Sequence, residues 1–540
     1  MAQNSGRGVE FGTAQLAEGW TLNRLTRPSR LNGANGIRTG ADGRIYVAQV
    51  AGSRVSAIDP DSGEISTISP IGGGITGPDD LVFDDRGDLY CTEITQNSVS
   101  VLRANGTSEI LTGGINVANP ITFHQGRLIV GELTIGARIM ELDRGGGAPR
   151  VIADNVPMVN AFDVGPDGKL YFPAQAANEI WRVSLDGGEP EVVAKDLGVP
   201  DSVKFHPDGY IVSTQVYSGQ VLKIDPRTGE KTVLADIGPG LDNVTFVNAR
   251  TFVSHITGSI HEITAPGQFK PLVDKGLQWP LGLALGSNGT LFVSDGGFSY
   301  QIATDQKDGV GEPKLAGMLF SPGFPGWIRD VAASGANDAG GEWVVTTANG
   351  TVNRFWPERQ ESEEIASGYG LLMGIAVASD GAVVFADAAS GKVWSAKGGN
   401  IDELASGLEH PMGLDIDANG SVYVAEAGAG RVVKIIGGRS ETVIDGLDEP
   451  QGLAVGGGKL YVIDVKTKQL ISCDLSGAAR HAVASGLPVG APPGIIAPRL
   501  GGVGDMCGPM HTMTGVEAGP DDTVYVSGDG EGSVLALRPA

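Results

Sequence analysis

The sequence is poor in cysteine, in basic residues and in long apolar runs. Its three cysteines, Cys91, Cys473 and Cys507, include no CxxC pair, so neither a disulfide framework nor a thiolate zinc site is indicated. No apolar run approaches the ~20 residues that a membrane-spanning helix needs, and the first eight residues lack the apolar core of a signal peptide. We therefore expect a cytoplasmic protein without membrane contact.

Basic residues are outnumbered, with 39 Lys and Arg against 63 Asp and Glu and a formal net charge of −24. Nucleic acid is an improbable partner, because phosphate binding needs a basic stripe and none is visible. An acidic surface keeps a protein in solution and is compatible with a divalent-cation site. A small-molecule substrate is the expected partner, and the oligomeric state is not set by the sequence.

Glycine is abundant, and the 83 glycines recur at fixed offsets inside apolar strand patterns. The unit Gly-Leu-Ala-Val-x-x-x-Gly-x-Leu-Tyr-Val recurs in variants along the whole chain, for example from Asp79, Asn160, Asp201 and Met412. Its strands alternate with period two, as half-buried antiparallel strands do. Asp-Gly, Asn-Gly or Gly-Gly at the hairpins supplies the positive φ of tight turns.

The residue just before the first strand of each unit serves as a marker of the repeat. Most steps between markers are 39–44 residues, the length of one four-stranded propeller blade. The twelve markers are Asn35, Asp79, Asn119, Asn160, Asp201, Asp242, Leu281, Arg329, Met373, Met412, Gln451 and Thr514.

The repeat predicts an all-β protein made of two six-bladed β-propellers in tandem, residues 1–275 and 276–540. A single ring of twelve blades would leave a wide, empty channel. The last blade ends at its third strand, and residues 20–28 form a spare strand near the N-terminus. We expect that strand to close a ring and so remove an open edge; the sequence does not say which ring. Two longer steps, 307–327 and 487–513, are predicted to be loops.

The markers should form two rings around two channels, because the first strand of a propeller blade is innermost. Asn and Asp suit turns, yet the same turn in the second half uses Leu, Met and Thr. Six oxygen-bearing side chains on one axis favour a shared hard cation, since Ca²⁺ accepts six to eight oxygen ligands; turn chemistry or a water-filled channel is the alternative. The predicted metal ligands are Asn35, Asp79, Asn119, Asn160, Asp201 and Asp242.

The residues that end the second strands are expected on the same face as the markers. In the first half they are Gln49, Glu93, Glu132, Gln175, Gln215 and His255. Glu93 and Glu132 are candidate acid/base partners or extra ligands. His255 is placed to titrate near neutral pH over the channel, against the alternative of a solvated loop histidine.

The first half, residues 30–275, resembles the SMP-30/gluconolactonase/luciferin-regenerating enzyme family, with its diisopropylfluorophosphatase-like and paraoxonase-like relatives. The resemblance implies a six-bladed propeller with calcium or another divalent ion (Mg²⁺, Mn²⁺ or Zn²⁺) in its channel. The family's Asn, Asn and Asp on blades three, four and five match Asn119, Asn160 and Asp201. Blade one departs, because Asn35 stands where the family has Glu; Asp79 or Asp242 would compensate.

The second half resembles the NHL-type propellers, whose consensus is close to the segment that begins at Pro411. Such repeats are commonly scaffolds or binding platforms. The strand from Gly87, "GDLYCTE", is weakly similar to streptogramin lyase, a propeller with a divalent metal and a His base. Residues 415–426 match the EF-hand spacing but lie in a predicted hairpin without flanking helices, so no calcium loop is expected there.

These resemblances imply a metal-dependent hydrolase of the lactonase or esterase type in the first channel. The ion would polarise the substrate carbonyl, and Asp201 would act as general base or as nucleophile. The same arrangement suits a lyase, an isomerase or a carbon–carbon hydrolase, and a second hypothesis is a non-catalytic scaffold with a structural ion. The markers of the second channel are mostly apolar and include Leu281, Met373 and Met412 around Arg329. They predict a packed, capped channel; the less favoured alternative is a site for an apolar substrate that bears an anion or a carbonyl.

Overall fold

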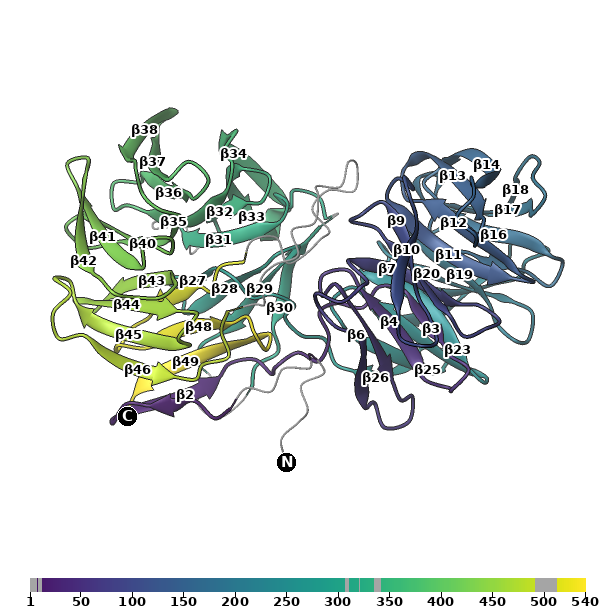
Figure 1. Ribbon diagram of the computed structural model, residues 1–540, viewed down its shortest axis with the longest axis horizontal. Helices are drawn as coiled ribbons and strands as arrows, with labels where there is room; N and C mark the ends of the chain where they lie inside the picture. Colours follow the sequence, from purple (N-terminus) through teal and green to yellow (C-terminus); the bar gives the residue numbers. More distant parts are fainter. Residues whose placement is uncertain (1–6, 8–11, 306–309, 320, 335–340, 491–511) are drawn as a thin grey trace. The chain divides into compact units, whose positions relative to one another are not determined.

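The computed structural model describes residue 7 and residues 12–305, 310–319, 321–334, 341–490 and 512–540. These residues form twelve antiparallel sheets, and each sheet is a propeller blade (Figure 1). The predicted all-β architecture of two tandem six-bladed propellers is therefore confirmed. None of the described helices has the length and apolar character that a membrane crossing requires.

The chain divides into two compact units near Gly276. The first unit contains Ser29–Gly276, and its six blades are built from consecutive strands. Its strands, blade by blade, are β3 (Ile37–Thr39), β4 (Ile45–Gln49), β5 (Arg54–Ile58) and β6 (Ile65–Ser69); β7 (Pro78–Phe83), β8 (Leu89–Glu93), β9 (Ser98–Leu102) and β10 (Ser108–Gly113); β11 (Ala118–His124), β12 (Arg127–Glu132), β13 (Ile135–Leu142) and β14 (Arg150–Pro157); β15 (Asp163–Val164), β16 (Lys169–Ala174), β17 (Glu179–Ser184) and β18 (Glu191–Ala194); β19 (Pro200–Phe205), β20 (Ile211–Gln215), β21 (Gln220–Ile224) and β22 (Lys231–Asp236); β23 (Leu241–Val247), β24 (Arg250–His255), β25 (Ile260–Ala265) and β26 (Gln268–Val273).

The second unit contains the later blades together with the N-terminal strands up to Pro28. Its strands are β27 (Leu283–Leu285), β28 (Thr290–Asp295), β29 (Phe298–Ala303) and β30 (Lys314–Met318); β31 (Ile328–Ala333), β32 (Trp343–Thr347), β33 (Thr351–Trp356) and β34 (Glu361–Ser367); β35 (Leu372–Val377), β36 (Val383–Asp387), β37 (Lys392–Lys397) and β38 (Asn400–Ala405); β39 (Pro411–Ile416), β40 (Val422–Glu426), β41 (Arg431–Ile436) and β42 (Arg439–Ile444); β43 (Pro450–Gly456), β44 (Lys459–Asp464), β45 (Gln469–Asp474) and β46 (His481–Ser485), with β1 (Gln15–Leu16) beside it; β47 (Val516–Ala518), β48 (Val524–Gly528), β49 (Ser533–Pro539) and β2 (Trp20–Arg24).

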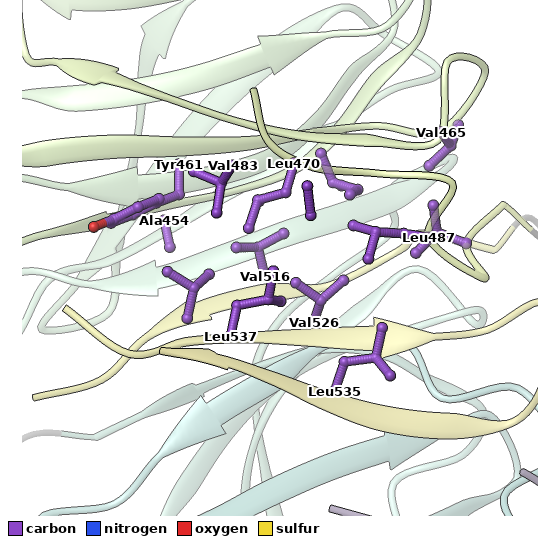
Figure 2. Close-up of a cluster of buried hydrophobic side chains, with 14 residues drawn as sticks. Ala454, Tyr461, Val465, Leu470, Val483, Leu487, Val516, Val526, Leu535 and Leu537 are labelled. Carbon is purple, nitrogen blue, oxygen red and sulfur yellow. The ribbon is translucent and has the colours of Figure 1, made fainter. Parts of the chain in front are cut away.

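The spare N-terminal strand closes the second propeller. β2 pairs antiparallel with β49, so that Leu22 faces Leu537 across the ladder, and it supplies the fourth strand that the last blade lacks. Trp20 and Leu22 pack against the apolar core between the last two blades, which Figure 2 shows around Leu470 and Val516. The sequence left open which ring this strand completes, and the pairing answers that question.

Within each ring, neighbouring blades meet through their innermost strands. Backbone N–H groups donate directly to the next blade, as from Gly36 to the Asp79 carbonyl (2.7 Å). This approach leaves no space for a side chain at such positions. A Cβ on Gly452, for example, would lie 2.2 Å from the Thr514 carbonyl oxygen. Ring packing thus requires the Gly of the Gly-Leu dipeptide at Gly452, whereas Asp80 and Asp330 carry side chains at the same offset in their blades.

The two predicted loops lie partly in the described residues. Residues 491–511, which include most of the predicted 487–513 loop and Cys507, lie outside them, as do residues 306–309 and 320 of the 307–327 segment. Within the latter, β30 (Lys314–Met318) pairs with β29 as the outer strand of its blade. The 307–327 segment, predicted to be a loop, is therefore partly a β-strand, because this blade needs a fourth strand to pair with its third strand, β29.

Candidate functional site

The six polar markers of the first unit converge on its central channel. Asn35, Asp79, Asn119, Asn160 and Asp201 are each only 4–7% exposed, whereas Asp242 is half-buried. Amide groups link the side chains around the ring. Asn119 Nδ2 donates to Asn160 Oδ1 (3.0 Å), and Asn160 Nδ2 donates to Asp201 Oδ2 (3.1 Å). On the opposite arc, Asn35 Nδ2 donates to Asp242 Oδ2 (3.2 Å).

Two oxygens of the ring are buried without any hydrogen-bond partner, Asp79 Oδ1 and Asn119 Oδ1. Other ring oxygens are engaged: Asn35 Oδ1 accepts from the Val50 N–H (3.2 Å), and Asn160 Oδ1 accepts from the Ala161 N–H (2.8 Å). A buried polar atom without a partner costs about 1–3 kcal/mol. The ring therefore holds two acceptors that an additional donor or cation would satisfy.

The ring carboxyls repel one another across the channel. Burial, followed by the neighbouring Asp80 carboxylate, raises the pKa of Asp79 to about 7. Burial and the charge of Asp79 hold the pKa of Asp201 well above its ordinary value. The pKa of Asp242 is raised in the same way by burial and by Asp201. Without a cation, protons are favoured on this ring at neutral pH.

The donor set of the ring fits a hard cation better than a soft one. It consists of carboxylate and amide groups, the oxygen ligands that Ca²⁺ and Mg²⁺ take, with no thiolate or imidazole for zinc. In the described part of the chain, no group of three or more His, Cys, Asp or Glu side chains has the geometry of a metal site. Amide oxygens such as Asn119 Oδ1 must therefore be part of any cation site in this ring.

The residues that end the second strands have a different role from the ring. In four blades of the first unit, a side-chain oxygen at this position accepts a hydrogen bond from the backbone N–H three residues before the marker of the same blade. The four contacts are Asn32 N–H to Gln49 Oε1 (2.8 Å), Thr76 N–H to Glu93 Oε1 (2.6 Å), Asn116 N–H to Glu132 Oε1 (3.1 Å) and Gly198 N–H to Gln215 Oε1 (2.9 Å). These side chains anchor the loops that carry the markers.

Glu93 and Glu132 are fully engaged in this anchoring. Glu93 Oε2 also accepts from the hydroxyls of Ser98 (2.7 Å) and Ser100 (2.6 Å). Glu132 forms an ion pair with Arg138 (2.5 Å). Burial raises the pKa of Glu132, but the hydrogen bonds from Arg138 and from two backbone N–H groups lower it further than burial raises it. The structure thus places both carboxylates outside the ring, unlike the expected acid/base pair.

His255 occupies the anchoring position of the sixth blade. Residue 239, three before the marker, is proline and has no N–H, so His255 Nε2 donates to the Pro239 carbonyl instead (2.7 Å). Its Nδ1 accepts from the Thr257 hydroxyl (2.8 Å). Burial lowers the pKa of His255 to about 4. This neutral, buried histidine differs from the expected base that titrates near neutral pH.

Gln175 is the member of this set that reaches the ring. In its blade the anchoring position is Ala174, which has no acceptor, and Gln175 follows in the short 3₁₀ turn η1 (Gln175–Ala177). Its Nε2 donates to Asp201 Oδ2 (3.3 Å). Asp201 is therefore held by two amides, Asn160 and Gln175.

A second polar layer lies deeper in the same channel, and sequence reasoning missed it. Arg38 Nε donates to the Leu81 carbonyl (3.2 Å) and Lys204 Nζ to the Phe162 carbonyl (2.8 Å). Burial, and then Arg38, lowers the pKa of Lys204 to about 8, although Asp80 opposes this shift. These residues are single polar side chains at fixed offsets from the markers, and that offset is the signal that would have found them.

An apolar cluster covers the ring on the side of the marker loops. It consists of Val50, Ile94, Val117 and Leu133, all buried, with Met158 packed against them. Val117 and Met158 have positive φ (49° and 62°), a conformation that costs non-glycine residues about 1–3 kcal/mol and is concentrated at functional sites.

Comparisons with known proteins identify no family for this chain. No family model matches the sequence, and no curated protein matches it. Among solved structures, a streptogramin B lyase is 19% identical over 51% of this chain and 94% of its own, with a TM-score of 0.38. A gluconolactonase from Xanthomonas campestris is 16% identical over 46% of this chain and 96% of its own, also at 0.38.

One match spans both units: the extracellular domain of a predicted hybrid two-component system from B. thetaiotaomicron is 11% identical over 96% of this chain and 82% of its own, with a TM-score of 0.32. With identities below 20% and TM-scores below 0.5, these matches carry no argument about this chain.

Proposed function

We propose that the first propeller is a divalent-cation-dependent hydrolase of the lactonase or esterase type, with its site at the polar ring. The two partnerless buried oxygens, Asp79 Oδ1 and Asn119 Oδ1, carry this proposal. Three carboxyl groups that repel one another and two unsatisfied acceptors on one axis form an arrangement that a cation stabilises. Ca²⁺ fits this set best, followed by Mg²⁺, because every ligand is a neutral or anionic oxygen.

The cation would be held by Asp79 and Asn119, together with one of the carboxylates of Asp201 and Asp242, since the ring does not bring three carboxylates to one point. When bound, it supplies Lewis-acid polarisation of a substrate carbonyl oxygen and lowers the pKa values of the surrounding carboxyls. The other contributions come from the chain itself. Asn160 and Gln175 fix Asp201 Oδ2 by hydrogen bonds, so the carboxylate is oriented before substrate arrives.

Asp201 is the general base of the proposal. Burial, and then Asp79, raises its pKa in the cation-free ring. A bound cation would lower that pKa, and the ionised carboxylate would then accept a proton from water at the carbonyl. Met158, the partly exposed side chain packed against the apolar cluster above the ring, would contact the apolar part of a lactone or ester and limit the access of bulk water. An enolate-forming lyase, an isomerase or a carbon–carbon hydrolase would use the same polarisation, and product analysis distinguishes them.

Elemental analysis of the purified protein, followed by a lactone and ester screen with and without chelator, tests the proposal. Asp201→Asn should lower kcat by about 100-fold or more while the melting temperature stays unchanged. Glu93→Gln is the matched control, because Glu93 anchors a loop outside the ring; it should lower stability and leave kcat unchanged. A protein without divalent metal, or an Asp201→Asn variant with full turnover, would contradict the proposal.

A non-catalytic platform with a structural ion is the second candidate. The observation that favours it is the burial of Val50, Ile94 and Val117, each 0–2% exposed, above the ring. In that case Asp201→Asn would lower the melting temperature, chelator would do the same, and no member of the substrate panel would turn over.

A further inference from the structure

The second propeller contains a cavity of about 150 Å³ on its own axis. Its walls are the innermost strands of the blades, and Met513 lies at the end nearest the markers. Three acidic residues line it, Asp330 on β31, Asp415 on β39 and Glu517 on β47. They come from every second blade, so they surround the axis. Asp330 is buried, whereas Asp415 and Glu517 are half-buried.

Each of these acids is tied to the following blade by one backbone hydrogen bond. Ile375 N–H donates to Asp330 Oδ2 (3.0 Å), Val455 N–H to Asp415 Oδ2 (2.7 Å) and Leu285 N–H to Glu517 Oε1 (3.0 Å). These bonds hold the three carboxyl groups against the axis. The sequence-based expectation of an apolar channel describes only the marker level, where Leu281, Met373 and Met412 are indeed buried.

The cavity is acidic and has no basic side chain of its own among the described lining residues. Burial, and then the charge of Asp415, raises the pKa of Asp330 to about 8. Burial and both neighbouring acids raise the pKa of Glu517 to about 8 as well. The groups thus repel one another in a space with little solvent, and a positive charge placed among them would be strongly favoured.

The first propeller shows what occupies the same level of a related channel. Asp80 and Asp163 stand at the same offsets from their markers as Asp330 and Asp415, and they accept the equivalent N–H groups, from Ile121 (3.1 Å) and Phe205 (3.0 Å). There, however, the chain supplies its own cations. Lys204, which is fully buried, interacts electrostatically with Arg38, Asp80 and Asp163.

The second propeller has small residues where those cations would be. The position of Lys204 corresponds to Ala454, and the position of Arg38 corresponds to Ala284, each three residues past its marker. Ala284 lines the cavity. Acidic residues are thus present in both rings, whereas the ammonium and the guanidinium group of the first ring are replaced by methyl groups in the second, of which that of Ala284 borders the cavity.

We infer that this cavity binds a small organic cation, a primary ammonium or a guanidinium with an apolar tail. An engineered cavity of about 150 Å³ accommodates a molecule of the size of benzene, so the ligand has about six heavy atoms. The ammonium or guanidinium would donate to Asp330, Asp415 and Glu517, while its tail would contact Leu283, Ile375 and Leu453. This site lies wholly within the second unit and is independent of the function proposed for the first.

Binding of n-butylammonium to the full chain tests the inference, with n-butanol as the neutral isostere. Isothermal titration should give a saturable signal for the amine and none for the alcohol. Glu517→Gln and Asp415→Asn, which keep side-chain shape, should weaken the amine at least 10-fold. Ala454→Lys should abolish binding, because it recreates in this ring the ammonium that Lys204 places in the first.

Asp163→Asn is the matched control, since Asp163 has the role of Asp415 in the other channel; it should bind the amine with unchanged affinity. Equal affinity for amine and alcohol, retention of binding in Glu517→Gln, or the absence of any amine binding at millimolar concentration would each overturn the inference. If Ala454→Lys does not fold, the two isosteric acid variants decide the question alone.

Discussion

At the scale of single residues, chemically similar side chains of the first propeller have different roles because their surroundings differ. Asp79 and Glu93 lie on the two innermost strands of one blade, yet Asp79 has a buried oxygen without partner and Glu93 has none. The difference follows from the position of each residue in the blade. Asp79, at the channel, lies near other carboxyl groups, whereas Glu93, at the end of the second strand, accepts hydrogen bonds from a backbone N–H group and two hydroxyls.

Asp79 should make the cation-free protein less stable as pH rises. Its pKa is raised from 3.8 to about 7 on folding, so its contribution is complete below the unfolded value and is lost as pH rises through the folded value. The raised pKa values of Asp201 and Asp242 act in the same direction. Denaturation in chelator from about pH 4 to pH 8 should therefore show a smaller decline of the free energy of unfolding for Asp79→Asn than for the wild type. Equal declines would contradict the assignment.

His255 should matter for stability and not for the pH dependence of activity. His255→Phe removes the donor to the Pro239 carbonyl and should cost about 1–3 kcal/mol, the penalty of an unsatisfied buried acceptor. His255→Gln, whose amide can donate to the same carbonyl, should restore part of that loss. The measurement is the denaturation midpoint, together with a pH profile of turnover. A kinetic pKa that disappears in His255→Gln would show that the histidine acts in catalysis.

At the scale of elements, the blades depend on close contact between innermost strands. Gly452 illustrates this, because its neighbour across the seam is the Thr514 carbonyl and not a side chain that could move. At Gly452 a residue with a Cβ would fit only if the two strands moved apart. The Gly of the Gly-Leu dipeptide therefore allows two blades to approach closely, whereas the Gly of a hairpin allows the positive φ of a tight turn.

Gly452→Ala should destabilise the second propeller by ~1–3 kcal/mol, the usual range for overpacking. Gly113→Ala is the matched control, since Gly113 lies in the outer strand β10 with no atom within 4 Å of an added Cβ. Its effect should stay within about 0.5 kcal/mol. Denaturant midpoints of the two variants measure the contrast. Similar midpoints would mean that the strands move apart at little cost.

At the scale of the whole molecule, the second ring is closed by a strand nearly the full length of the chain away. β2 and β49 join residues 20–24 to residues 535–539. β2 gives the last blade its fourth strand, so the stability of this blade depends on both ends of the sequence.

Leu22→Asp should therefore destabilise the second unit by about 1–3 kcal/mol, because Leu22 packs against the core that ends at β49. Asn23→Asp introduces the same charge on the exposed face of the same strand and should be nearly neutral. Hydrogen exchange is the measurement: amides of β47–β49 should lose protection in Leu22→Asp, whereas those of β3–β6 should not. Loss in both units alike would contradict a closure confined to the second ring.

The sequence by itself determined the repeat, the number of blades, the all-β class and the six polar markers of the first ring. It could do so because strand period, hairpin residues and marker spacing are local properties that recur in every blade. It also indicated a spare strand, by counting, but not the blade that receives it, since pairing between distant strands leaves no local signature in either one.

Only the tertiary structure decided what the polar residues contact. Glu93, Glu132 and His255 appear equivalent to ring residues when only the face of the propeller is considered, yet backbone groups of the marker loops engage them. The acids of the second channel and the cations of the first are isolated residues in apolar strands, and their meaning depends on neighbours from other blades. The physical reason is that charged groups interact through space over several ångströms, with residues that are distant in sequence, whereas the repeat is a pattern of residues that are close in sequence.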